Sequence, residues 1–287
     1  MFEIKVVVLD LDNTLWDWLH VWDAGHTARM SAIEREFNVR TSDIIEEVRK
    51  VNQRAGTSEY TLMPYELPIL AKIEPDERKR KEKIQRVQHA FFRACKHELS
   101  LYEDTYSTLE KLNEAQIKVV GFTDSVKYWA VKRIKQTNLD GTLSKLFVSE
   151  ETVNPLNDSF DKNRTLDKDE YELTKTRIMT VTQSRRKPDP AIVKEIAHLE
   201  SCRTSELIVV GDSLLKDVSM ANSAGAKSAY AKYGDVRHED SYEKLRQVSH
   251  WTNEDIERDR NLNPKSTMPD ITLETSIAEL LNHINLN

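Results

Sequence analysis

The sequence predicts an α/β fold with a parallel sheet, and two observations carry this prediction. Short apolar runs rich in β-branched residues end in polar residues and alternate with helical stretches, as is typical of parallel strands. About a hundred residues separate the first two runs, far more than one crossover helix needs, which indicates an insertion. The predicted strands lie near residues 5–12, 118–125, 146–149, 207–213 and 228–231.

Helices are predicted between these strands. Residues 99–115 form an entry segment and helix before the second strand, and residues 189–199 form a helix before the fourth. The helix at 217–224 should end at Gly225, because glycine readily adopts the left-handed conformation that closes many helices.

The insertion after the first strand has the composition and periodicity of several helices. It runs over about residues 17–100 and is broken by prolines at 64 and 75, so we expect a separate helical cap domain. The rest of the chain, residues 1–16 and 101–287, is expected to form the catalytic core. Trp16, Trp18 and Trp22 cluster where the chain enters the insertion, and packing is favoured there because aromatic side chains bury large areas.

Two later segments depart from the alternation of strands and helices. Residues 150–186 are strongly charged and are expected to form an extended excursion or hairpin at the edge of the sheet. Residues 234–268 are polar, and their pattern predicts no particular secondary structure. Beyond them, residues 269–271 indicate a short strand, and residues 273–284 indicate a closing amphipathic helix.

Composition excludes several classes of protein. The chain has 287 residues, of which 39% are hydrophobic, enough for one large core or a core with an inserted domain. No stretch approaches the ~18 apolar residues of a membrane span, and no signal-peptide pattern is present, so we expect a cytoplasmic protein that binds no membrane. A formal net charge of −6 argues against nucleic-acid binding. Cys95 and Cys202 lack paired spacing, which predicts neither disulfides nor a zinc site. The oligomeric state stays open.

Two aspartates, Asp10 and Asp12, follow the first apolar run. Residues two apart in an extended strand share a face, so both carboxylates should project together from the end of this strand. Because like charges repel, a divalent metal, a proton on one carboxylate, or both must compensate. One carboxylate could then act as a nucleophile or ligand, and its neighbour as an acid or base.

Three further polar features fall at or beside the ends of later strands, where open α/β sheets place their ligands. Thr123 is a hydroxyl at a strand end and is followed by Asp124. Lys187 is a fixed cation just before a helix started by proline. Asp212 and Asp217 lie five residues apart across a strand-to-helix loop. Each feature is weak alone, but their order and their placement reinforce one another.

This combination resembles the haloacid dehalogenase superfamily, in its branch of aspartate-nucleophile phosphatases. The four motifs of the family are matched in order by Asp10 with Asp12, by Thr123, by Lys187, and by Asp212 with Asp217. The resemblance covers about residues 1–15 and 101–233, and it implies a Rossmann-like core with helices on both faces of the sheet. A cap inserted just after the first motif is common in this family.

The resemblance also implies an activity. Dehalogenases of this superfamily lack the second aspartate of the first motif, so Asp12 implies phosphoryl transfer instead of halide release. The implied enzyme is a Mg²⁺-dependent phosphatase, a phosphoric monoester hydrolase that acts on a small phosphorylated metabolite. Asp10 would attack phosphorus to form an aspartyl-phosphate. Asp12 would protonate the leaving oxygen and then take a proton from the hydrolytic water.

Phosphoryl transfer needs mainly positioning and cations around the transferred group. The phosphate ligands implied by the resemblance are Thr123, Asp124 through its amide, and Lys187. The implied magnesium ligands are Asp10, Asp12 through its backbone carbonyl, Asp212, and Asp217 either through water or by orienting another ligand.

Two other functions stay open. A phosphomutase or phosphotransferase would pass the phosphoryl group to a hydroxyl other than that of water, and the core motifs do not separate these activities. A non-catalytic binding or regulatory protein could keep the fold and use residues 150–186 to engage a partner. The cap should set the substrate, with Arg49, Arg54 and Lys72 as candidates for binding an anionic tail.

Overall fold

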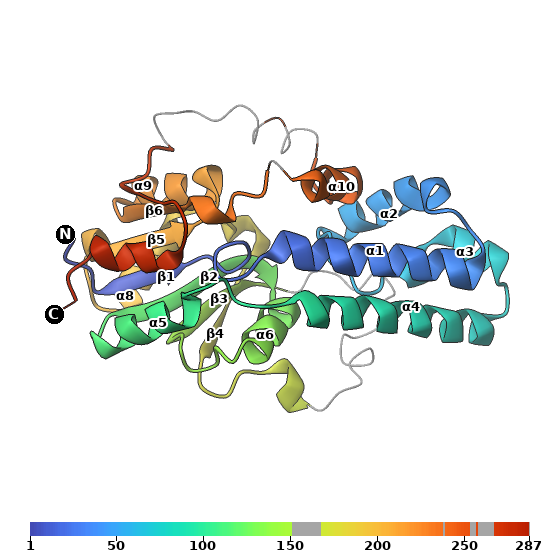
Figure 1. The fold of residues 1–287 in the computed structure, drawn as a ribbon, viewed down its shortest axis with the longest axis horizontal. Coiled ribbons are helices and arrows are strands. Elements are labelled where there is room, and N and C mark those ends of the chain that lie inside the picture. Colours follow the sequence, from blue (N-terminus) through green and yellow to red (C-terminus); the bar gives the residue numbers. More distant parts are fainter. Residues whose placement is uncertain (151–167, 238, 253–256, 258–266, 287) are drawn as a thin grey trace.

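Within the part of the chain that the structure describes, seven strands form one parallel sheet in the order β4-β3-β2-β1-β5-β6-β7. The computed structural model describes residues 1–150, 168–237, 239–252, 257 and 267–286 (Figure 1). The predicted α/β class and parallel sheet are confirmed. The strands are β1 Val6–Leu9, β2 Lys118–Val126, β3 Lys145–Ser149, β4 Arg177–Val181, β5 Leu207–Gly211, β6 Lys227–Ala231 and β7 Ile271–Leu273.

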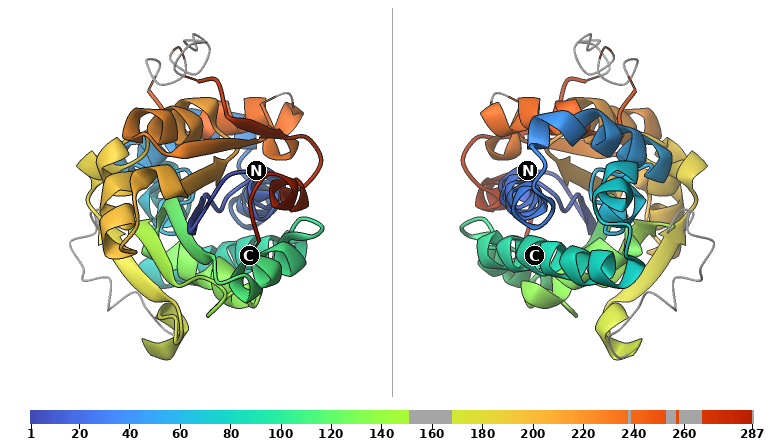
Figure 2. Two further views of the ribbon diagram at one scale, coloured as in Figure 1. Left: turned by 90° about the vertical axis from the view of Figure 1, so that its left-hand side faces the viewer. Right: turned by 90° about the vertical axis from the view of Figure 1, so that its right-hand side faces the viewer.

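Helices cover both faces of the sheet, as the Rossmann-like prediction requires (Figure 2). Successive side chains of a strand point to opposite faces, so Val7 and Leu9 enter one apolar cluster while Val6 and Val8 enter another. The first cluster includes α5 (Thr105–Glu114), α6 (Lys127–Gln136) and the 3₁₀ helix η7 (Ile277–Asn282). The second includes α8 (Pro190–Leu199) and α9 (Ser219–Ala224).

The segment between β1 and β2 contains several helices. We call α1 to α4 the inserted helices. α1 and α4 lie side by side and extend away from the sheet (Figures 1 and 2). The domain boundaries at 16 and 100 stay a prediction. The inserted helices are α1 Trp18–Phe37, α2 Thr41–Ala55, α3 Pro68–Ile73 and α4 Glu77–Glu98, with the 3₁₀ helix η1 at Met63–Glu66.

The two chain segments that join the inserted helices to the sheet run next to each other. Trp16 forms a β-bridge with Leu101, and the Tyr102 amide donates to the Leu15 carbonyl at 2.9 Å. The entry and the exit of the insertion are therefore held together, directly beyond the carboxyl end of β1.

The polar segment at 234–268, whose structure was not predicted, contains α10 (Asp240–Val248). Leu245 and Val248 of α10 belong to the same apolar cluster as Ile44 and Val48 of α2. The Asn52 side-chain amide also donates to the Val248 carbonyl at 2.8 Å. The core of the inserted helices is thus completed by a late part of the chain. Residues 253–256 and 258–266 lie outside the described residues.

The edge of the sheet differs from the expected excursion or hairpin. β4 pairs in parallel with β3, so the described part of this edge is a regular strand. Within β4 only Val181 is buried, while Ile178 and Met179 are partly buried and Arg177 and Thr180 are exposed, so the strand has only a weak apolar pattern. The part of the expected excursion at 151–167 lies outside the described residues.

The expected closing helix at 273–284 is shorter than predicted. Leu273 still belongs to β7, and the helical part is the 3₁₀ turn η7. Ser276 caps this turn by accepting from the Ala278 amide at 3.2 Å, while Glu279 accepts from the Ser276 amide. In the described part of the chain, no helix has both the length and the apolar character that crossing a bilayer demands.

Candidate active site

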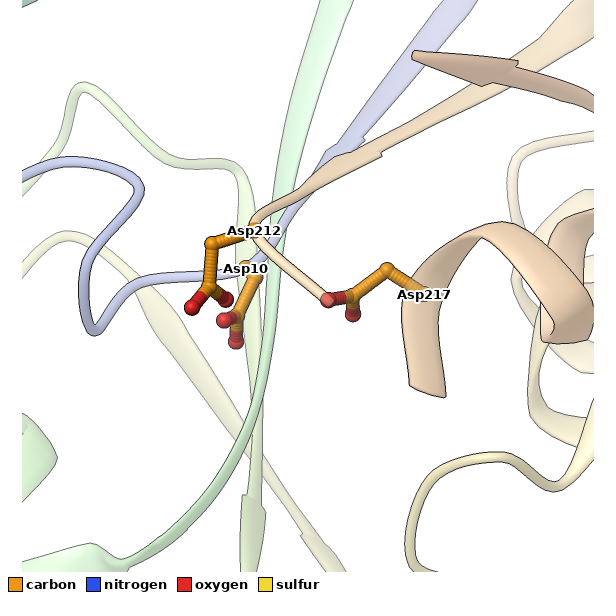
Figure 3. A group of neighbouring side chains, drawn as sticks. All are labelled: Asp10, Asp212 and Asp217. Atoms are coloured by element: carbon orange, nitrogen blue, oxygen red, sulfur yellow. The ribbon is translucent and has the colours of Figure 1, made fainter. Parts of the chain in front are cut away.

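Three carboxylates meet at the carboxyl edge of the sheet. Asp10, Asp212 and Asp217 each offer an oxygen within 4.8 Å of the other two (Figure 3). Asp10 directly follows β1, and Asp212 directly follows the neighbouring strand β5. Asp217 comes from the single turn at Leu214–Val218 that leads into α9. Adjacent parallel strands therefore bring together residues that are far apart in the sequence.

Glycine at position 211 allows Asp217 to approach. A Cβ atom at Gly211 would lie 2.2 Å from the Asp217 Cγ atom, which is far inside contact distance. The Ser213 amide also donates to Asp217 Oδ2 at 3.2 Å. The strand end and the following turn thus fix this carboxylate from two sides.

The loop after β1 is held by its own side chains. Asn13 adopts a left-handed conformation, with a φ of 58°, and its Oδ1 accepts from the Leu19 amide in the first turn of α1. Its carbonyl lies against Gly234, where a Cβ atom would come within 1.7 Å of it. The Tyr233 hydroxyl donates to the Thr14 carbonyl at 2.8 Å. The turn after β6 therefore closes over the first motif.

Lys187 inserts its ammonium group between two of the carboxylates. Its Nζ lies 2.5 Å from Asp10 Oδ1 and 2.7 Å from Asp217 Oδ1, and its side chain is 3% exposed. Burial lowers the pKa of Lys187, but Asp10, Asp217 and Asp124 outweigh this effect and raise it overall. Lys187 is therefore a permanent cation at neutral pH.

Lys187 alone does not neutralise this group of three carboxylates, of which Asp217 is buried and the other two are partly buried. Burial raises the pKa of Asp10 and Asp217, against the opposing charge of Lys187, and that of Asp217 reaches about 6. Burial and the two neighbouring carboxylates raise the pKa of Asp212 well above its usual value. The group is short of positive charge.

The donor set fits a hard divalent cation. Asp217 Oδ1 is buried and makes an ion pair with Lys187, but it has no hydrogen-bond partner among the described residues. Carboxylate oxygens are the ligands that Mg²⁺ prefers. Asp10, Asp212 and Asp217 could therefore hold such an ion and relieve their mutual repulsion.

The second motif lies beside this group. Thr123 is 2% exposed, and its Oγ1 accepts from the Ser125 amide at 3.0 Å. Asp124 accepts from the Lys187 amide at 3.0 Å and from Lys216 Nζ at 3.0 Å. Burial raises the pKa of Asp124, but Lys216 and Lys187 outweigh it and lower the pKa overall. Lys216, one residue before Asp217 in the chain, is thus paired with the second motif.

Asp12 is not one of the three clustered carboxylates, although its charge contributes to the raised pKa of Asp10. Its Oδ1 accepts from Trp16 Nε1 at 2.8 Å and from Arg133 Nη1 at 3.2 Å. The predicted role of its backbone carbonyl as a metal ligand stays a prediction. Burial raises the pKa of Asp12, Arg133 lowers it, and Glu59 raises it again, with a net increase. The two aspartates of the first motif thus have different surroundings.

Sequence reasoning missed Arg133 and Glu59. Arg133 is 3% exposed and lies on α6 beside the buried Ala130 and Ile134. A charged residue on the apolar face of a helix after the second motif was the available signal, because buried arginines are almost always paired. Glu59, in the connection between α2 and η1, gave no such signal. Trp16 is fully buried, as the packing prediction for it requires, and it also donates to Asp12.

Comparison with known proteins identifies the group to which this fold and site belong. The family model of the haloacid dehalogenase-like hydrolases matches residues 4–225. A search of curated proteins finds no match.

Solved structures share the fold at low sequence identity. A 2-haloacid dehalogenase from Pseudomonas syringae pv. Tomato DC3000 has a TM-score of 0.52 and 15% identity, with 97% of each chain covered. A predicted phosphoglycolate phosphatase from Haemophilus somnus 129pt has a TM-score of 0.52 and 16% identity over 99% of each chain. A putative hydrolase of the same superfamily from Bacillus subtilis, described as bound to magnesium, has a TM-score of 0.50 and 13% identity over 98% of each chain. These similarities concern the fold.

Proposed function

Because the chain belongs to the haloacid dehalogenase-like hydrolases, we propose that it is a magnesium-dependent phosphatase that hydrolyses a small phosphorylated metabolite through an aspartyl-phosphate. One observation carries the proposal. Asp10 lies among carboxylates and Lys187, whereas Asp12, two residues later, is outside this group and is bound by Trp16 and Arg133. The site thus separates a nucleophile that faces positive charge from a second carboxyl that can exchange a proton.

In the first half of the reaction, an Asp10 oxygen forms a bond to phosphorus and the bond from phosphorus to the leaving oxygen breaks. Asp12 gives its proton to that oxygen, so the product leaves as a neutral alcohol. Lys187 holds Asp10 by its Oδ1 and offsets the charge around the transferred group.

In the second half, water attacks the phosphorus of the aspartyl-phosphate. Asp12, now ionised, takes the proton of this water as its oxygen bonds to phosphorus. The bond between phosphorus and the Asp10 oxygen breaks, which releases phosphate and restores both carboxyl groups. The Thr123 hydroxyl and the Asp124 amide are the proposed ligands of the phosphate oxygens.

Asp10, Asp212 and Asp217 are the residues that would hold magnesium. When bound, the ion supplies positive charge that lowers the repulsion between Asp10 and an anionic substrate. The charge deficit of this group and the magnesium in the Bacillus subtilis protein support the assignment.

Asp12 favours a phosphatase over a dehalogenase. A halide leaves without a proton, whereas an alcohol oxygen leaves far more easily once it is protonated. A partly buried carboxyl that two side-chain donors hold, and that stands outside the group of three, suits the second task. The similarity to the Pseudomonas syringae dehalogenase concerns the fold and does not oppose this choice.

The test is phosphate release from a panel of sugar phosphates, nucleotides and phosphorylated acids, with Mg²⁺ and with a chelator. Asp10→Asn keeps the size of the side chain but removes its nucleophilicity, and we expect turnover to be lost while the fold is retained. Asp104→Asn is the matched control, because Asp104 is exposed and asparagine also tolerates its left-handed backbone, with a φ of 63°. Equal activity of Asp10→Asn and the wild type would refute the proposal. Transfer of phosphate to a second hydroxyl, without release, would indicate a phosphotransferase.

A further inference from the structure

A buried arginine joins Asp12 to the inserted helices. Arg133 Nη1 lies 3.2 Å from Asp12 Oδ1, 3.4 Å from Asp12 Oδ2 and 3.3 Å from Ser125 Oγ. Its other terminal nitrogen, Nη2, donates to Glu59 Oε1. The side chains of Arg133 and Glu59 are 3% and 9% exposed. One guanidinium therefore bridges two carboxylates that come from different parts of the fold.

Glu59 reaches α6 from the connection between α2 and η1. Its backbone carbonyl accepts from Trp129 Nε1 at 3.0 Å, and Trp129 lies one helical turn before Arg133. The carbonyl and the carboxylate of a single residue thus bind two successive turns of the same helix. The position of Glu59 is fixed relative to α6, and through Arg133 relative to Asp12.

The chemistry of arginine suits this arrangement. The guanidinium is planar, and its donors diverge in fixed directions, so holding one end orients the other. A lysine has one freely rotating ammonium and would not transmit an orientation in this way. A buried ion pair also adds little to stability, because removing two charges from water costs about as much free energy as their attraction provides. Ala130 and Ile134, which flank Arg133 on the buried face of α6, show that this face is otherwise apolar.

We propose that Arg133 is a positioning residue that aims the Asp12 carboxyl at the leaving oxygen, and that Glu59 completes this arrangement from the inserted segment. The inference rests on the proposed function, in which Asp12 is the acid for the leaving oxygen. It adds that the acid is correctly aimed when the segment around Glu59 is seated on α6. Glu59 from the inserted segment and Arg133 from α6 thus orient the proton donor together.

Two phosphate esters with different leaving groups separate positioning from a merely structural role. An alkyl phosphate needs protonation of its leaving oxygen, whereas 2,4-dinitrophenyl phosphate releases a stable anion without it. For Arg133→Met we expect kcat/KM to fall about 100-fold or more with the alkyl ester and less than about tenfold with the dinitrophenyl ester. Because kcat/KM reports the formation of the aspartyl-phosphate and not its hydrolysis, the later task of Asp12 as a base does not confuse the comparison.

Glu59→Gln is the second variant, since it keeps the size of the side chain and an oxygen that can accept from Arg133. It should show the same selective loss on the alkyl ester, of about tenfold, and it decides the matter if Arg133→Met does not fold. Arg133→Lys should recover only part of the loss, because an ammonium cannot hold both carboxylates in the same geometry. Lys135→Met, on the same helix but partly exposed, is the control for changing a cation on α6.

The outcomes are distinct. A selective loss on the alkyl ester supports the inference. An equal loss on both esters in folded Glu59→Gln, or no loss on either, overturns it while leaving the proposed function intact. A wild-type protein that hydrolyses neither ester with Mg²⁺, nor any ester of the panel above, refutes the proposed function and this inference with it.

Discussion

Removing the charge of Lys187 tests whether this lysine holds the acidic group together. Lys187→Met keeps a long apolar side chain and deletes the ammonium that lies 2.5 Å from Asp10 and 2.7 Å from Asp217. The carboxylate oxygens of this group lie within 4.8 Å of one another, and two ionised carboxylates at that limit repel by about 3.5 kcal/mol at an effective dielectric constant of ~20. Removing one partner of a buried ion pair costs about 3–5 kcal/mol. We therefore expect the free energy of unfolding to fall by about 3–5 kcal/mol at pH 8 without metal.

The loss should depend on pH with a definite sign. Burial already raises the pKa of Asp217 to about 6, and loss of Lys187 raises it further above the value of the unfolded chain. The folded variant then binds more protons than the unfolded chain, so its stability falls as the pH rises through this window. The deficit relative to the wild type should thus be larger at pH 8 than at pH 5.5.

Urea denaturation at both pH values, with a chelator and with Mg²⁺, measures these effects. Magnesium should restore part of the lost stability, by about 2.7 kcal/mol at a concentration 100 times its dissociation constant. Lys216→Met is the matched control, because its ammonium pairs with Asp124 but its side chain is 49% exposed, so a smaller loss is expected. A loss below ~1 kcal/mol for Lys187→Met, or one that does not change with pH, would refute this reasoning.

Three further predictions concern other parts of the molecule. Gly211→Ala should displace Asp217, since the new Cβ would lie 2.2 Å from its Cγ, and we expect Mg²⁺ to lose its effect on the melting temperature of this variant. An unchanged magnesium-dependent rise in melting temperature would contradict this. Burial lowers the pKa of His26 to about 4, so the unfolded chain takes up a proton that the folded state does not. The free energy of unfolding should then fall by about 2 kcal/mol from pH 8 to pH 5 through this group, and His26→Phe should lose that part of the pH dependence. Trp16→Phe removes the Nε1 donor to Asp12 and should lower kcat with an alkyl phosphate by about tenfold while leaving the fold intact. Full activity in this variant would show that Trp16 only packs.

The grouping at the sheet edge could be predicted because its causes are local. Each of Asp10, Asp212 and Thr123 stands at or just after the end of an apolar run, and parallel strands place these ends at one edge. The order of the strands and the closeness of Asp217 to Asp10 could not be predicted from the sequence and are known only from the folded chain. Family resemblance assigned the roles of these residues, and the structure supplies distances for them.

The rest of the site could not be predicted because helical periodicity indicates which side of a helix is buried but not what it meets. Arg133 is 121 residues from Asp12 and 74 residues from Glu59, so no spacing rule relates them. β4 was not predicted for a different reason, since an edge strand with one buried residue carries little apolar signal. α10 lies in a polar segment, and its few apolar residues can be recognised as core residues only because they pack with those of α2 in the folded chain.

The packing of α10 limits how the inserted helices can move. A domain joined to another by two adjacent linkers can rotate about them as a rigid body. Here Trp16 and Leu101 form such an adjacent pair, at the base of α1 and α4. Among the described residues, however, α10 follows β6 and the turn at Lys232–Gly234 in the chain, and it contacts α1 and α2 (Figure 1). This third connection restricts such a rotation. Any wide opening of the site must therefore either separate α10 from α2 or extend the connection between β6 and α10.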